Sequence, residues 1–151
     1  MDRIDAAILR ALQLDGRLTN VELAEHVGLS PSACHRRVKT LEAEGVIEGY
    51  RALLNAERIG RGLTVIVLAT LENQKRETME RFEAAVAEID RVTDCFLTTG
   101  AEDYFLRLLV RDARDYERVH REQLSGLPGV ARLVSNIAMR TVFARRPVSV
   151  G

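Results

Sequence analysis

A cluster of basic side chains in an otherwise neutral chain is the first feature with a chemistry of its own. The sequence has 151 residues, of which 22 are basic and 22 acidic. In the stretch SACHRRVKT the residues His35, Arg36, Arg37 and Lys39 lie close together, and the next acidic residue is Glu42. Grouped cations can bind phosphate groups, and one arginine can donate two hydrogen bonds to a guanine. The cluster predicts a surface that binds nucleic acid; the alternative is an ordinary solvated helix face.

The residues around the cluster predict the helix that presents it. Ser30 is a favourable N-cap, and Pro31 suits the first helical position. At about 100° per residue, Cys34, Val38 and Leu41 fall on one side and form an apolar stripe. The basic residues then lie on the exposed side, where small residues near the start of the helix would let it approach base edges.

Two further helices and a ribbon are expected around this helix. Apolar residues recur at Ile4, Ile8 and Leu12, which predicts a first helix. Thr19 and Glu22 can form a capping box that begins a second, short helix. The stretch VIEGYRALL after the basic helix alternates and contains a glycine, as a β-ribbon would. These elements predict a winged helix-turn-helix.

The second half of the chain alternates between strands and helices. LTVIVLATL, RVTDCFLT, DYFLRLLV and VARLVSNIAMRTVF are strand-like runs. Met79, Phe82, Val86 and Ile89 mark one helix between the first two runs, and residues 112–125 predict another before the last. The order β-α-β-β-α-β is that of a ferredoxin-like unit. The fold class is therefore predicted to be α+β.

These patterns divide the chain into two small domains. We expect a DNA-binding domain over residues 1–50, a linker over 51–62 and a ferredoxin-like domain over 63–143. Residues 144–151, which include the stretch RRPVSVG, form a tail for which the sequence predicts no role.

Several classes of function find no support in the sequence. The two cysteines, Cys34 and Cys95, have no metal-binding spacing, and no nucleophile elbow, phosphate-binding glycine loop or HExxH motif is present. We therefore expect no enzyme, no metal site and no cofactor. No apolar run is long enough to span a bilayer, and charges come too early for a signal peptide, which predicts a cytoplasmic protein without a membrane partner.

In this order and spacing, the motifs resemble those of a known family. The stretch IDAAILRALQLDGRLTNVELAEHVGLSPSACHRRVKTLEAEGVIEGYRALLN is similar to the DNA-binding half of the Lrp/AsnC (leucine-responsive, feast/famine) transcription regulators. The similarity continues through TTGAEDYFLRLLVRDARDYERV, LPGV and SNIAMRTV. The resemblance implies dimers that pair their sheets and assemble into octamers or open helices, bind double-stranded DNA, and bind a small-molecule effector, usually an amino acid.

Two sets of site residues are expected. Ser32, Ala33 and Arg36 would read bases, while the phosphate backbone would be held by His35, Arg37, Lys39 and, on the wing, Arg51. The resemblance places an effector site on the loop and on the last strand, at Thr99, Gly100, Ala101, Glu102, Asp103, Tyr104, Ser135, Asn136, Ile137 and Ala138. The loop is also an adequate hairpin turn in which Asp103 only caps the chain.

Three functions follow in order of preference. The first is a sequence-specific transcription regulator that responds to a small-molecule effector, associated with the nucleoid in the cytoplasm. The second is an architectural DNA-wrapping protein without an effector. The third, a ferredoxin-like enzyme with an added helical domain, lacks any set of convergent catalytic groups.

Overall fold

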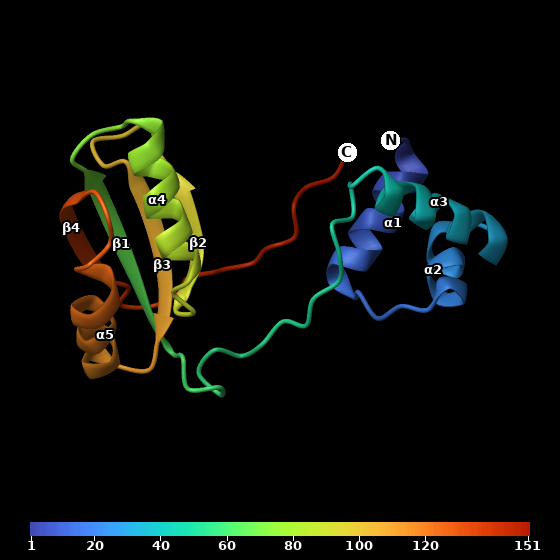
Figure 1. The fold of residues 1–151 in the computed structure, drawn as a ribbon. Coiled ribbons are helices and arrows are strands. Elements are labelled where there is room, and N and C mark those ends of the chain that lie inside the picture. Colours follow the sequence, from blue (N-terminus) through green and yellow to red (C-terminus); the bar gives the residue numbers. More distant parts are fainter. The chain divides into compact units, whose positions relative to one another are not determined.

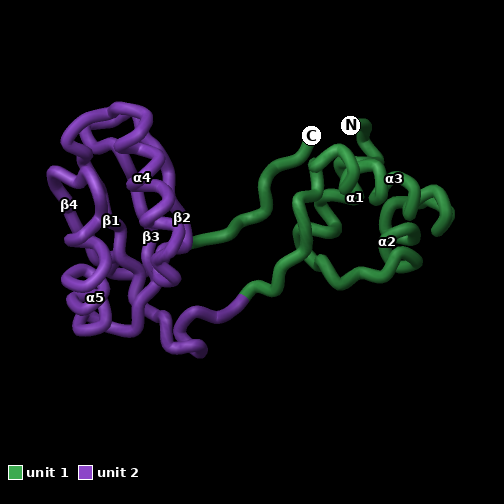
Figure 2. The backbone as a smooth tube through the Cα atoms, viewed as in Figure 1, with its two compact units in different colours: residues 1–53, 143–151 green, residues 54–142 purple.

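The computed structural model describes residues 1–151 and separates them into two compact units (Figures 1 and 2). The first unit contains residues 1–53 together with 143–151, and the second contains residues 54–142. The chain therefore passes between the units twice. Each unit has its own cluster of buried apolar side chains, so each is described by itself.

The first unit consists of three helices with well-formed ends. They are α1 (Arg3–Leu14), α2 (Asn20–Val27) and α3 (Pro31–Ala43). Thr19 and Glu22 form the predicted capping box of α2, and Ser30 caps α3 by accepting from the backbone N–H of Ala33 at 3.3 Å. Ile8 and Cys34 are fully buried between the helices. The helix predictions are therefore confirmed, together with the apolar stripe of α3.

The β-ribbon expected after α3 does not form. Residues 46–54 contain no strand. The backbone N–H groups of Val46 and Ile47 both donate to the carbonyl of Leu41, and the Tyr50 hydroxyl donates to Glu42 at 3.1 Å. The alternating pattern thus serves to pack the segment onto α3, and no second strand is available to pair with it.

The second unit is a four-stranded antiparallel sheet with two helices. In chain order its elements are β1 (Leu63–Leu71), α4 (Arg76–Ala87), β2 (Val92–Leu97), β3 (Tyr104–Val110), α5 (Ala113–Val119), a π-helical turn (His120–Leu124) and β4 (Val130–Ile137). The strand order is β2-β3-β1-β4, which agrees with the predicted ferredoxin-like topology. β4 is shorter than predicted because β1, its only neighbour, begins at Leu63: the last bond along this edge runs from the Ala138 N–H to the Thr64 carbonyl.

The two faces of this sheet have different surroundings. Alternate residues of β1 and β3 are buried against α4 and α5, with Phe82 and Leu124 among the helix residues in this core. On the other face no helix covers Ile66, Leu68 or Phe105, which are only partly buried. One face of the sheet is thus left open, with these apolar side chains next to the ion pair of Arg107 and Asp94.

Candidate DNA-binding and effector sites

The exposed side of α3 carries the predicted base-reading residues. Ser32 and Arg36 are exposed and Ala33 is half-buried, while Cys34 and Leu41 fix the opposite side of the helix in the core. The start of α3 therefore presents small side chains, and the arginine follows one turn later. This arrangement suits a helix that enters the major groove with its first residues at the base edges.

Two of the predicted phosphate-binding cations are already engaged within the chain. The Arg37 guanidinium donates to Asp2 at 2.8 Å and to Asp5 at 2.7 Å. Both bonds raise the pKa of Arg37, and the bond to Asp5 has the larger effect. Lys39 pairs with Glu42 at 2.8 Å. Arg37 thus joins α3 to the start of α1, a use that its place in the basic run did not indicate.

Arg36 differs from its neighbours in having no such partner. Its side chain is exposed and takes part in none of the ion pairs of the first unit. His35 is also exposed, although Glu42 lies close enough to interact with its charge. Arg51 is exposed on the extended segment where a wing was expected. Arg36 is therefore the cation of α3 most available to DNA.

Asp103, the predicted ammonium partner, is committed to the fold. Its side chain accepts from the Leu71 backbone N–H at 2.7 Å and from the Gln74 side-chain amide at 2.6 Å, and the residue is 7% exposed. Its own N–H donates to the Ala69 carbonyl. The carboxylate thus holds the loop after β2 against the end of β1, which is close to the capping alternative. No sequence pattern predicted that Gln74 would bond to Asp103.

The remaining loop residues lie around this anchor. Thr99, Gly100 and Ala101 are exposed, and a side chain at Gly100 would meet nothing within 4 Å. Glu102 lies 3.8 Å from Arg132 of β4. The loop is therefore open to an outside molecule on its tip and closed at its base.

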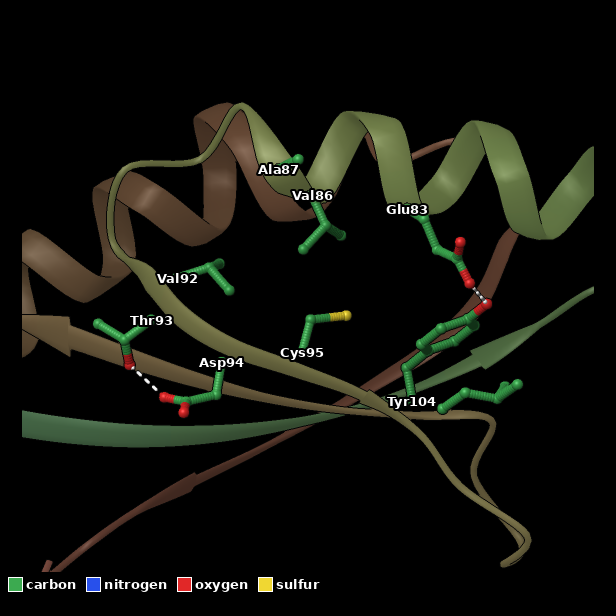
Figure 3. A pocket seen from close by; sticks show the side chains of 9 residues that line it. Glu83, Val86, Ala87, Val92, Thr93, Asp94, Cys95 and Tyr104 are labelled. Atoms are coloured by element: carbon green, nitrogen blue, oxygen red, sulfur yellow. Dashed lines mark hydrogen bonds between the residues drawn. The ribbon is translucent and has the colours of Figure 1, made fainter. Parts of the chain in front are cut away.

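A pocket of about 380 Å³ lies beside the loop, between α4 and the edge strand β2 (Figure 3). The buried Tyr104 forms one wall, and its hydroxyl donates to Glu83 at 2.7 Å. Burial is the main cause that raises the pKa of this tyrosine, and the contact with Glu83 raises it further. Cys95 and Leu97 line the strand side. Val86 of α4 lies across the pocket from Cys95 (Figure 3). Glu83 stands outside the apolar stripe of α4, so the sequence did not predict its contact with Tyr104.

The two halves of the predicted effector site do not meet within one chain. Tyr104, which follows the loop, pairs with Ala69, whereas Ile137 pairs with Val65. Four residues of strand separate these positions, or about 13 Å at the usual rise of ~3.3 Å per residue. Alternation also divides the strand segment between the faces: Ser135 bonds to Tyr116 of α5, while Asn136 pairs with Ile66 of the open face.

Neither a metal centre nor a membrane span is found in the structure. No group of three or more histidine, cysteine, aspartate or glutamate side chains is placed to hold a metal ion. No helix combines the length and apolar character needed to cross a bilayer.

Comparison with known proteins agrees with this arrangement. The profile of the family "Lrp/AsnC ligand binding domain" matches residues 64–148, and that of "Winged helix-turn-helix DNA-binding" matches residues 1–48. The leucine-responsive regulatory protein of Salmonella typhimurium is 42% identical over 94% of this chain and 87% of its own. An uncharacterized HTH-type transcriptional regulator of Sinorhizobium fredii is 48% identical over 80% of this chain and 94% of its own.

A solved structure extends the similarity to the whole fold. A transcriptional regulator of Neisseria meningitidis in complex with L-Met superposes with a TM-score of 0.93 at 35% identity, covering 98% of this chain and 96% of that one. These matched proteins are named as regulators of transcription. The chain therefore belongs to the Lrp/AsnC family of transcriptional regulators and joins a DNA-binding domain of the winged helix-turn-helix class, here without a paired wing, to a ligand-binding domain.

Proposed function

We propose that this regulator binds its DNA sites through the exposed side of α3 and that an amino acid alters its DNA binding or its assembly. The observation that carries the DNA-binding half is Arg36, an exposed and unpaired arginine behind the small residues Ser32 and Ala33. Direct base contact is assigned to these three residues. His35, Arg37, Lys39 and Arg51 are assigned to the phosphate backbone, Arg37 and Lys39 after giving up part of their present ion pairs.

An amino acid is the proposed ligand because of the proteins that this chain resembles. Relatives at 42% identity are named leucine-responsive regulatory proteins, and the regulator of Neisseria meningitidis was solved with L-Met. The exposed loop residues Thr99, Gly100 and Ala101 offer backbone N–H groups that can receive a carboxylate. Since Asp103 is engaged with Leu71 and Gln74, the ammonium partner has to come from elsewhere.

A second copy of the chain is the proposed source of the missing part of this site. Within one chain, residues 99–104 lie at one end of the sheet, whereas residues 135–138 run from its middle to the other end. We therefore assign one site that uses both segments to two copies of the chain. The open apolar face with Ile66, Leu68 and Phe105 supplies a surface on which sheets can pair. We therefore propose a homodimer that assembles further, to an octamer or an open helix.

The experiment that tests the sensor is a thermal-shift panel with each of the twenty amino acids at fixed protein concentration. A ligand present at about 100 times its dissociation constant adds roughly 2.7 kcal/mol of stability, which is easily seen as a higher melting temperature. Each amino acid that raises the melting temperature is then titrated into a binding assay with promoter DNA. A flat panel would reject amino-acid sensing.

An architectural protein that wraps DNA without an effector is the second candidate. The chain is neutral overall, and so it gains affinity mainly where assembly aligns several basic helices on one DNA. This candidate requires broad footprints with little sequence preference and no response to any amino acid. In both cases the DNA partner implies a location in the cytoplasm, at the nucleoid.

A further inference from the structure

The last residues of the chain make specific contacts with α1 inside the first unit. The Gln13 side chain forms two hydrogen bonds with the backbone of Val148: its amide donates to the carbonyl at 3.0 Å, and its carbonyl accepts from the N–H at 2.6 Å. The Arg10 guanidinium donates to the Val150 carbonyl at 2.8 Å. The Gln13 side chain thus bonds to both the N–H and the carbonyl of one tail residue, as a residue of a neighbouring β-strand can do.

Apolar contacts accompany these hydrogen bonds. Val150 is partly buried and packs against the apolar core of the first unit. A Cβ on Gly151 would lie only 3.2 Å from the Cβ of Ala6, a residue that is 4% exposed. The tail therefore lies directly on α1 and covers part of its apolar side. An extended segment held only by chance would leave its carbonyls to water, whereas here two of them and one N–H are bonded to side chains of a single helix.

The position of the tail in the chain gives this contact a consequence. Ten residues separate Ile137, the end of β4, from Val148, and β4 contains the strand segment assigned above to the effector. The first unit is therefore joined to the second through two connections, the segment after α3 and the tail after β4 (Figure 2). A change at the end of β4 has a short covalent path to the helix that supports α3 through the Arg37 pairs with Asp2 and Asp5.

We propose that α1 carries a docking surface for the tail of the same chain, residues 147–151, and that this docking couples the end of β4 to the DNA-binding unit. Arg10, Gln13 and the apolar side of α1 form the surface. Its ligand is a segment that offers backbone carbonyls at alternate residues, Val148 and Val150, together with the apolar side chain of Val150. The docking itself does not depend on the effector, whereas the coupling rests on the proposed function.

Cross-linking in the full-length protein tests the docking. In the present backbone the Cβ atoms of cysteines introduced by Ala6→Cys and Gly151→Cys would lie 3.2 Å apart. A disulfide needs about 3.5–4.5 Å, so a shift of the last residue by a few tenths of an ångström brings the pair into range. Cys95→Ser removes the exposed native thiol, and Cys34 is buried. Mild oxidation should yield a monomer cross-linked within one chain, seen as a mobility shift on a non-reducing gel and as a linked pair of peptides by mass spectrometry.

Two further variants make the result specific. Gln13→Ala should slow the cross-linking because it removes both bonds to Val148. Leu14→Ala, at an 80% exposed position on the same helix, should leave the rate unchanged. A disulfide-linked dimer would mean that the surface binds the tail of a second copy, and the absence of any cross-link would mean that the tail is not docked. Either result overturns the proposal.

The coupling is tested with a chain that ends at residue 146 and with Gln13→Ala. In both variants the effector should still raise the melting temperature, but its effect on the DNA dissociation constant should be lost. An undiminished effect on the dissociation constant would reject the coupling while leaving the docking intact. If the unaltered protein responds to no amino acid, the proposed sensor function fails, and the cross-linking result still decides the docking.

Discussion

At the scale of single residues, the basic run on α3 separates into side chains with different duties. Arg36 has no partner in the chain, whereas Arg37 is held by Asp2 and Asp5. We therefore expect Arg36→Ala to weaken binding to a specific site by about 1–3 kcal/mol and to relax sequence preference. The measurement is a fluorescence titration with specific and random duplexes at equal salt. Equal weakening on both duplexes would make Arg36 a phosphate contact.

Arg37→Ala serves as the comparison within the same helix. Its loss should lower the melting temperature of the protein without DNA, since it leaves Asp2 and Asp5 without their shared partner. The backbone N–H of Asp5 is the main reason that the pKa of Asp2 is lowered, and Arg37 adds to it. A variant that melts normally but loses DNA affinity would mean that Arg37 contributes to DNA binding alone and adds nothing to the stability of the fold.

Asp103 is a second residue whose role differs from the one its motif implies. Replacement by alanine leaves the Leu71 N–H and the Gln74 amide without their acceptor in a buried place. The expected loss is about 2–4 kcal/mol of unfolding free energy, since bonds to a charged group contribute ~1.5–3 kcal/mol each and are not additive. Asp103→Asn should lower the unfolding free energy by less, because the Gln74 amide can rotate so that its oxygen accepts from the N–H of the new asparagine. Urea unfolding measures both, and an unchanged midpoint for Asp103→Ala would contradict the anchoring role.

At the scale of elements, local sequence rules predict helices better than they predict strand pairing or contacts between distant residues. The caps at Thr19 and Ser30 and the stripe of Cys34 and Leu41 depend on residues three or four apart, so they could be read directly. The ribbon after α3 was predicted from alternation alone and is absent because a strand also needs a partner. The bond of Asp103 to the Leu71 backbone in β1 and the bond of Arg37 to Asp2 join groups more than thirty residues apart, which no local pattern contains.

The turn before β4 provides a prediction about one element. Gly129 has a φ of +71°, and a Cβ there would lie 2.5 Å from the Cγ2 of Thr78, which is buried in α4. Gly129→Ala should therefore lower the unfolding free energy by about 2–4 kcal/mol, from backbone strain together with overpacking. Gly126→Ala is the matched control, because nothing lies within 4 Å and its φ is not positive. Equal melting temperatures for the two variants would show that the turn can shift.

At the scale of the whole molecule, the open face of the sheet predicts how copies associate. Phe96 and Phe105 lie side by side on it, with ring centroids 6.2 Å apart. Phe105→Glu would place a charge in any sheet-to-sheet interface, where an unpaired charge is costly. We expect this variant to become monomeric in analytical ultracentrifugation. Leu53→Glu, which adds the same charge at an exposed position outside the sheet, should leave the assembly unchanged. A dimer that survives Phe105→Glu uses another surface.

The stability of the second unit should also depend on acid through one buried carboxylate. Asp115 accepts from the Arg111 N–H at 3.0 Å and from Arg118 at 2.7 Å, and its side chain is fully buried. The bond from the Arg111 N–H is the main cause that holds the pKa of Asp115 below its ordinary value, and the bond from Arg118 lowers it further. A lowered pKa in the folded state means that folding favours the charged form. Its contribution is therefore complete above the unfolded pKa of about 3.9 and is lost as the pH falls through the folded value.

Asp115→Asn isolates this contribution, because the amide keeps the shape of the side chain but cannot titrate. Between about pH 4 and pH 2, the unfolding free energy of the unaltered protein should fall more steeply with decreasing pH than that of the variant. At neutral pH the variant should be the less stable of the two, since Arg118 and the nearby Arg91 lose the charge they face. Urea unfolding at a series of pH values measures both differences. Parallel curves would mean that other carboxylates control acid unfolding, and that the arginines around Asp115 hold their places without its charge.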